Sequence, residues 1–168
     1  MSEKILVFGA SSYVGKHLIR KLGQDRAIGT YNRTPIDNGR HFDSLHMRVG
    51  DIFDGREQVS HAVILIGDTD PDSCVADPAL SRAINVESTK TMIDDLLALG
   101  VKIIFTSTEF VFDGNRGMYN EKDKINPILL YGEQKAEIEI YLQTVAPDAC
   151  ILRLAKVYGL TPSDGTLF

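Results

Sequence analysis

A phenol and an amine lie four positions apart in the segment YGEQK at residues 131–135. Because residues four apart share one face of a helix, Tyr131 and Lys135 would project together from a helix that starts here. An ammonium group near a phenol favours the phenolate and lowers a pKa that starts near ~10, which suits general acid–base chemistry. The spacing alone is common by chance, and a packed aromatic beside a solvated lysine is the ordinary alternative.

A hydroxyl group that complements this pair lies upstream, in Ser107-Thr108 at the end of an expected strand. The Thr108 hydroxyl can polarise a substrate carbonyl while Tyr131 exchanges a proton with it. The candidate catalytic residues are therefore Thr108, Tyr131 and Lys135.

The segment GASSYVG at residues 9–15 has the form of a phosphate-binding glycine turn between a strand and a helix, with Ser12 where a middle glycine is expected. Gly9 permits the tight turn and Gly15 permits close packing of the helix on the sheet. Serine hydroxyls can donate to a phosphate beside the backbone N–H groups. Two structural glycines in an ordinary strand–helix unit are the alternative. We expect the pyrophosphate of a dinucleotide to contact Gly9, Ser11, Ser12, Tyr13, Val14 and Gly15.

The end of the second expected strand indicates which dinucleotide binds. An acidic residue there holds the ribose 2′-OH of NAD, whereas an arginine accommodates the 2′-phosphate of NADP. This chain has Asn32 and Arg33 and no carboxylate, which favours NADP(H) and leaves NAD(H) possible; a solvated surface arginine is the alternative. Further along, Asp51 and Ile52 are placed to contact the adenine, although an aspartate in a loop more often forms a turn.

Short β-branched runs alternate with longer helical patterns, as in strand–helix units on a parallel sheet. Strands are expected over residues 4–8, 27–31, 46–49, 61–66, 101–107 and 150–154. Helices are expected from the glycine turn to Gly23, from Pro78 to Leu99, and from Gly132 to about Val145. The fold predicted is α/β, a Rossmann-type doubly wound parallel sheet of about six or seven strands with helices on both faces.

Length and composition favour one globular domain, an NAD(P)-binding unit over residues 1–168. A net charge of −5 with scattered Lys and Arg gives no footprint for nucleic acid. Two cysteines and no clustered His or Cys predict neither a disulfide framework nor a metal site. The absence of a signal peptide or a long apolar span predicts a cytoplasmic protein away from membranes. The apolar stripe on residues 83–99 suits the core better than a homodimer interface.

Several motifs recur together, in this order, in one known family. They are GASSYVG at 9–15, AINV at 83–86, STEFVFDG at 107–114, the segment from Pro127 to Lys135, ILR at 151–153 and VYG at 157–159. The chain resembles an extended short-chain dehydrogenase/reductase and is similar in particular to the dTDP-4-dehydrorhamnose reductases. STEFVFDG and YGEQK are far more specific than the glycine turn.

The resemblance implies an oxidoreductase that uses NADPH to reduce a keto group of a nucleotide sugar. At matching positions, Tyr131 is the proton donor, Lys135 lowers its pKa and binds ribose, and Thr108 is the hydroxyl partner of the carbonyl. Asn85 matches an asparagine that helps to hold the site. The resemblance also places Ile66, Gly67 and Ser107 beside the cofactor, with Asn85, Tyr131 and Lys135.

The chain also departs from that family. Leu65-Ile66-Gly67-Asp68 replaces Asn-Ala-Ala, Glu109-Phe110 replaces Asp-Tyr, and Ala155-Lys156 replaces a small polar residue and an aromatic. Family members continue beyond VYG into a portion that builds most of the sugar-nucleotide pocket, and only Leu160 to Phe168 follow here. The alternative to an enzyme is therefore a non-catalytic NAD(P)-binding regulatory or interaction module, with a partner subunit, that lacks a complete substrate site.

Overall fold

A computed structural model describes residues 3–54 and 56–159 of the chain. Its centre is one sheet of six parallel strands in the order β3-β2-β1-β4-β5-β6. The strands are β1 (Lys4–Phe8), β2 (Ala27–Tyr31), β3 (Arg40–His41), β4 (Val59–Ile64), β5 (Lys102–Thr108) and β6 (Cys150–Leu154). The predicted Rossmann-type α/β fold is confirmed.

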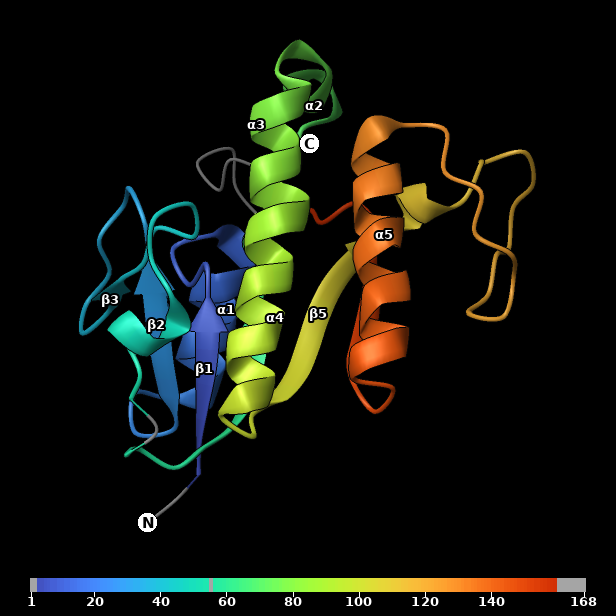
Figure 1. The fold of residues 1–168 in the computed structure, drawn as a ribbon. Helices are drawn as coiled ribbons and strands as arrows, with labels where there is room; N and C mark the ends of the chain where they lie inside the picture. Colours follow the sequence, from blue (N-terminus) through green and yellow to red (C-terminus); the bar gives the residue numbers. More distant parts are fainter. Residues whose placement is uncertain (1–2, 55, 160–168) are drawn as a thin grey trace.

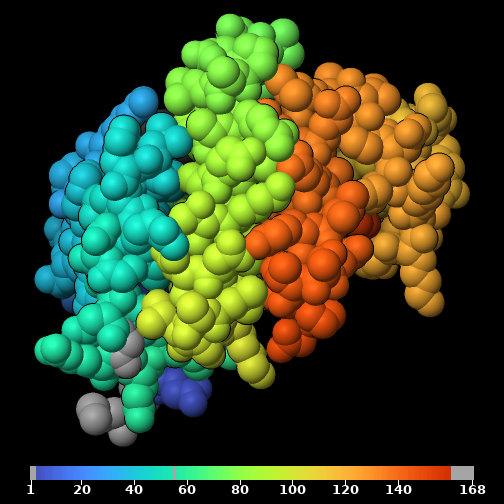
Figure 2. Space-filling view, viewed as in Figure 1, coloured from blue at the N-terminus to red at the C-terminus, as the bar shows by residue number. Residues whose placement is uncertain are grey.

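Helices cover both faces of this sheet. Helix α1 (Tyr13–Leu22) lies behind it in Figure 1, whereas α4 (Ser88–Ala98) and α5 (Leu130–Val145) lie in front. Figure 2 shows α4 and α5 side by side, with the segment between β5 and α5 extending beyond them at the edge of the molecule. Strand order reverses between β1 and β4, and a crevice at such a switch point is where doubly wound sheets bind ligands.

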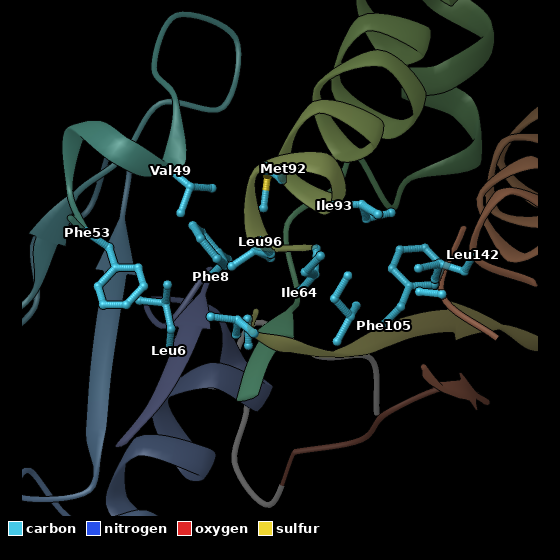
Figure 3. Packing of buried hydrophobic residues seen from close by; sticks show 14 of the residues in the cluster. Leu6, Phe8, Val49, Phe53, Ile64, Met92, Ile93, Leu96, Phe105 and Leu142 are labelled. Carbon is cyan, nitrogen blue, oxygen red and sulfur yellow. The ribbon is translucent and has the colours of Figure 1, made fainter. Parts of the chain in front are cut away.

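The core lies between the sheet and helices α4 and α5 (Figure 3). Strand β4 is central, and Ala62, Val63 and Ile64 are buried in succession, as expected for a strand covered on both faces. The apolar stripe of α4 belongs mainly to this core, because Met92, Ile93 and Leu96 are buried. The side chains that fill it include Leu6, Phe8, Ile64, Met92, Leu96 and Phe105.

The third strand was predicted at residues 46–49, and this prediction is wrong. Strand β3 is Arg40–His41, which pairs with the end of β2. Asp43 forms a turn instead of a strand: its carbonyl accepts from His46 N and Met47 N, and its carboxylate accepts from Leu45 N. An aspartate whose side chain bonds to the backbone two residues on is typical of turns, and the apolar residues that follow pack without joining the sheet.

The long helix predicted from Pro78 to Leu99 is present as a continuous helical stretch that widens in its middle. It comprises α3 (Pro78–Arg82), a π-helical segment η2 (Ala83–Glu87) and α4, and a further short helix α2 (Pro71–Ala76) precedes it. Ser88 N donates to Ala83 O, five residues back. The hydroxyls of Ser88 and Thr89 both donate to Ile84 O, at 2.8 and 3.3 Å. Both hydroxyls thus bond back to a carbonyl of the wide turn, a pattern that accompanies departures from regular helix geometry.

Candidate active site

The glycine turn closes tightly between β1 and α1. Gly9 has φ of 81°, in the left-handed region that glycine adopts without strain. A Cβ at Gly15 would lie 2.4 Å from Gly9 O, so only glycine lets α1 approach the turn this closely. Ser12 is the N-cap of α1 and its Oγ accepts from Gly15 N at 3.1 Å. Its hydroxyl proton stays free to donate to a ligand.

The start of α1 fits an anionic group. Among the residues that the structure describes, the backbone N–H groups of Ser11, Tyr13 and Val14 have no protein acceptor. Free N–H groups at the N-terminus of a ten-residue helix, together with its dipole, form the usual binding site of a pyrophosphate. The residues present therefore fit the diphosphate of a dinucleotide.

The residues predicted around the adenosine end follow β2 and β3. Asn32 and Arg33 are both exposed, and within the described chain the Arg33 guanidinium has no ion-pair partner. Asp51 ends a 3₁₀ turn, η1 (Val49–Asp51), where its carboxylate accepts from Arg48 N at 2.7 Å. The turn-forming alternative considered for Asp51 is therefore present, and contact of Asp51 and Ile52 with adenine stays a prediction.

The loop after β4 is fixed by Asn85, which the π-helical segment presents to it. Asn85 Oδ1 accepts from Asp68 N at 2.8 Å, and Asn85 Nδ2 donates to Asp68 O at 2.9 Å and to Gln134 Oε1 at 2.6 Å. A Cβ on Gly67 would lie 3.1 Å from Asn85 Oδ1 and 3.6 Å from Lys135 Nζ. Asn85 thus joins the Ile66-Gly67 loop to α5 and holds it beside Lys135.

Thr108, Tyr131 and Lys135 converge where β5 ends and α5 begins, and all three are buried. Thr108 caps the 3₁₀ turn η3 (Glu109–Val111), its Oγ1 accepting from Phe110 N. A Cβ on Gly132 would lie 2.2 Å from Phe110 O, so glycine is required for α5 to pack on this turn. The rings of Phe110 and Tyr131 meet edge to face at 6.2 Å.

The predicted lowering of the Tyr131 pKa is wrong. Burial of the phenol, followed by the negative charge of Glu109, raises the pKa of Tyr131 to about 12. Lys135 Nζ lies 5.9 Å from the centroid of the Tyr131 ring and donates to Thr106 O at 3.0 Å. Tyr131 is therefore a protonated phenol at neutral pH, which is the form that donates a proton.

Burial also changes the acidity of Lys135. Removal from water lowers the pKa of this ammonium group to about 8, although the charges of Cys74 and Glu139 act to raise it. Lys135 Nζ lies 4.6 Å from the centroid of the Phe105 ring. At neutral pH the group still carries its proton and can donate to a ligand beside Gly67.

Lys135 is expected to make the chain more stable as the pH rises from 8 to 10. Its folded pKa of about 8 lies below the ordinary 10.5, so the unfolded chain binds more protons in this window. The raised pKa of Tyr131 acts in the opposite direction only above pH 10. Between pH 8 and 10 we expect the free energy of unfolding to increase by roughly 2 kcal/mol more in the wild type than in Lys135→Met. Urea denaturation measures this, and parallel pH profiles would contradict it.

A buried ion pair lies one helical turn beyond Lys135. Glu139 is 1% exposed and accepts from Ser107 Oγ at 2.5 Å and from Arg153 Nη2 at 2.6 Å. Arg153 Nε adds contacts of 3.0 and 3.2 Å to the two carboxylate oxygens. The Ser107 hydroxyl, predicted to contact the cofactor, is thus engaged by Glu139, which joins β5, α5 and β6 behind the site.

A cavity of about 510 Å³ adjoins the site, bounded by the segment between β5 and α5. Glu109 and Phe110 form its inner wall, next to Thr108 and Tyr131. Its two arginines already have acidic partners, since Arg116 pairs with Asp123 and Arg153 with Glu139. Other lining residues are Phe112, Tyr119, Ile128 and Leu129.

Sequence reasoning missed the supporting residues of the site. Glu139 follows Tyr131 and Lys135 at the same spacing of four, so the helical face that identified the pair also contains the carboxylate. Gln134 and Asp68, which bond to Asn85, gave no such signal, because their contacts cross between elements far apart in the sequence.

No group of three or more His, Cys, Asp or Glu side chains within residues 3–54 and 56–159 is arranged to hold a metal ion. None of the helices in the described part of the chain has both the length and the apolar character needed to cross a bilayer.

Known proteins resemble this sequence at the level of one family and of individual relatives. The family model described as RmlD substrate binding domain matches residues 3–166. The curated dTDP-4-dehydrorhamnose reductase of Aggregatibacter actinomycetemcomitans is 28% identical over 166 residues, 93% of this chain and 52% of that protein. Methionine adenosyltransferase 2 subunit beta of Bos taurus is 26% identical over 162 residues, 94% of this chain and 48% of that protein. The chain thus spans about half the length of these curated relatives.

Solved structures share the fold. The crystal structure of a hypothetical dTDP-4-dehydrorhamnose reductase from Sulfolobus tokodaii has a TM-score of 0.83 and 28% identity, covering 92% of this chain and 56% of that one. The dTDP-4-dehydrorhamnose reductase of Bacillus anthracis str. Ames, in complex with NADP, has a TM-score of 0.76 and 22% identity, covering 96% and 56%. At this lower identity the likeness concerns the fold alone.

Proposed function

The chain belongs to the RmlD substrate binding domain family, and we propose that it is the cofactor-binding part of an NADP(H)-dependent reductase acting on a keto group of a nucleotide sugar. Its sheet is the NAD(P)-binding fold of the extended short-chain dehydrogenase/reductases. One observation carries the proposal. Thr108, Tyr131 and Lys135 converge on the edge of the sheet where the glycine turn presents three free backbone N–H groups.

Each side chain has a role that its surroundings support. NADPH, when bound, supplies a hydride to the carbonyl carbon. Tyr131 donates its phenolic proton to the carbonyl oxygen, so that the ketone becomes a hydroxyl group. Lys135, still charged at neutral pH, binds the ribose and stabilises the phenolate left behind. Thr108 orients the carbonyl by a hydrogen bond from its hydroxyl.

The protonated state of Tyr131 suits the proton-donating step of a reduction. A phenol that holds its proton at neutral pH is a proton donor, whereas oxidation of an alcohol needs the phenolate as base. The experiment that tests the proposal measures NADPH oxidation in the presence of a nucleoside diphosphate 4-keto-6-deoxyhexose, together with calorimetric binding of NADPH and NADH. Binding of NADPH without turnover of any keto-sugar would reject the catalytic role.

Arg33 is expected to determine the preference for NADPH over NADH. Its guanidinium is exposed and unpaired in the described chain, and a charge-assisted bond to a 2′-phosphate contributes roughly 1.5–3 kcal/mol. Because the site is open to solvent, we expect Arg33→Ala to weaken NADPH binding about tenfold and to change NADH binding by less than about twofold.

Calorimetry with both cofactors measures the effect of Arg33→Ala. Arg20→Ala, which removes an exposed arginine from the last turn of α1, is the control. An equal loss of affinity for NADPH and NADH in Arg33→Ala would exclude a contact with the 2′-phosphate.

A second candidate is a non-catalytic NAD(P)-binding subunit. It is supported by the likeness to a protein named as a subunit of methionine adenosyltransferase 2, which extends over 94% of this chain. This candidate predicts that NADPH raises the melting temperature without turnover, because a ligand that binds only the folded state stabilises it. It also predicts a stable complex with another protein, and a pull-down that finds none would count against it.

A further inference from the structure

The Thr108 hydroxyl both donates and accepts a hydrogen bond in the ligand-free chain. Its single proton is donated to Glu109 Oε2 at 3.0 Å, while its oxygen accepts from Phe110 N at 3.2 Å. A hydroxyl has one proton to donate. Thr108 can therefore donate to a substrate carbonyl only after Glu109 has given up that bond.

Glu109 is also the uncompensated charge beside the reacting groups. It is half-buried, and in the described chain it has no cationic partner, since Arg116 and Arg153 pair with Asp123 and Glu139. Its carboxylate borders the cavity and lies close enough to Tyr131 for its charge to act on the phenol. When the hydrogen bond from Thr108 is broken, a carboxylate in this position needs another hydrogen-bond donor.

We propose that Glu109 is a specificity-determining residue that accepts a hydrogen bond from a hydroxyl or amino group on the substrate carbon next to the reacting carbonyl. Substrate binding then replaces the hydrogen bond between Thr108 and Glu109 by two hydrogen bonds to the substrate. The substrate's donor group hydrogen-bonds to the Glu109 carboxylate, and its carbonyl oxygen accepts the hydrogen bond that Thr108 donates to Glu109 in the ligand-free chain. This rests on the proposed reductase function and narrows its substrates to α-hydroxy or α-amino ketones.

The test compares two probes, a nucleoside diphosphate 4-keto-6-deoxyhexose with a C3 hydroxyl and its 3-deoxy analogue. For the wild type we expect kcat/KM to favour the hydroxylated probe by roughly 10- to 100-fold, as for the loss of one charge-assisted hydrogen bond. Glu109→Ala should reduce that preference to less than about threefold. Glu121→Ala, which removes a second carboxylate from the wall of the same cavity, should leave it unchanged.

Glu109→Gln serves as a second variant of the same size, and thermal melting verifies that each variant is folded. It can still accept from the substrate but lacks the charge, so its preference should fall between those of the wild type and Glu109→Ala. An unchanged preference in Glu109→Ala, or an equal loss on both probes, would overturn the proposal.

Measurements of ligand binding test the role of Glu109 independently of the reductase function. If the wild type turns over neither probe, the reductase function fails. The role of Glu109 is then decided by calorimetric dissociation constants for the corresponding C4-hydroxy sugars in the presence of NADP⁺. A preference for the C3-hydroxylated sugar that Glu109→Ala abolishes supports the role, and equal dissociation constants reject it.

Discussion

Replacing Tyr131 by Phe is expected to reduce keto-sugar-dependent NADPH oxidation by about 10²- to 10⁴-fold, the range that a positioned general acid contributes. The substitution removes the proton donor and retains the ring, which packs edge to face on Phe110 at 6.2 Å. NADPH should still bind, since the turn of Gly9–Gly15 is untouched.

A second tyrosine on the same helix provides the control. Tyr141 donates to Asp94 at 2.5 Å on the outer side of α5, away from the site, so Tyr141→Phe should retain activity. Steady-state rates and calorimetry with NADPH measure the two effects separately. A loss of less than about tenfold in Tyr131→Phe would show that another group donates the proton.

Glu139→Ala is expected to lower the free energy of unfolding by about 3–5 kcal/mol, as when one partner of a buried ion pair is removed. The carboxylate is 1% exposed and holds Arg153, whose side chain is only 19% exposed. Its loss leaves a guanidinium without a counter-charge and the Ser107 hydroxyl without an acceptor. Urea denaturation at pH 7 measures the change.

Glu137→Ala is the matched control. Glu137 lies on the same helix as Glu139, but it pairs at the surface with Arg82 of α3 and Lys90 of α4. Exposed pairs contribute less than about 1 kcal/mol. The double variant Glu139→Ala, Arg153→Met should recover part of the loss, since it no longer buries an unpaired charge. If Glu139→Ala were as stable as Glu137→Ala, the buried network would not hold β5, α5 and β6 together.

Local sequence patterns were sufficient for most of the fold. The apolar run of β4 and the glycine turn of β1 are signals that depend on neighbours in the chain, and both were interpreted correctly. The third strand was not, because β3 has only two residues and its position depends on pairing with Thr30 and Tyr31. The π-helical segment also escaped prediction, because the shift of one backbone bond from four to five residues leaves the apolar pattern of the helix unchanged.

The sequence predicted that Thr108, Tyr131 and Lys135 would lie together, and it did not predict the electrostatics around them. The spacing of four identified Tyr131 and Lys135, and the end of a strand identified Thr108. Their acidities depend on burial and on Glu109, which only the packed structure reveals. A sequence places an ammonium near a phenol, but it does not show that the ammonium donates to Thr106 O instead.

The π-helical segment also makes the placement of Asn85 depend on the number of residues in this helix. Removing one residue between Ala83 and Glu87 would let this segment close into regular α-helical turns, and the wide turn that presents Asn85 would be lost. Asn85 could then no longer reach both Asp68 and Gln134, the contacts that hold the β4 loop against α5. A single-residue deletion here would thus leave a more regular helix and a misaligned site, with no side chain of the catalytic set altered.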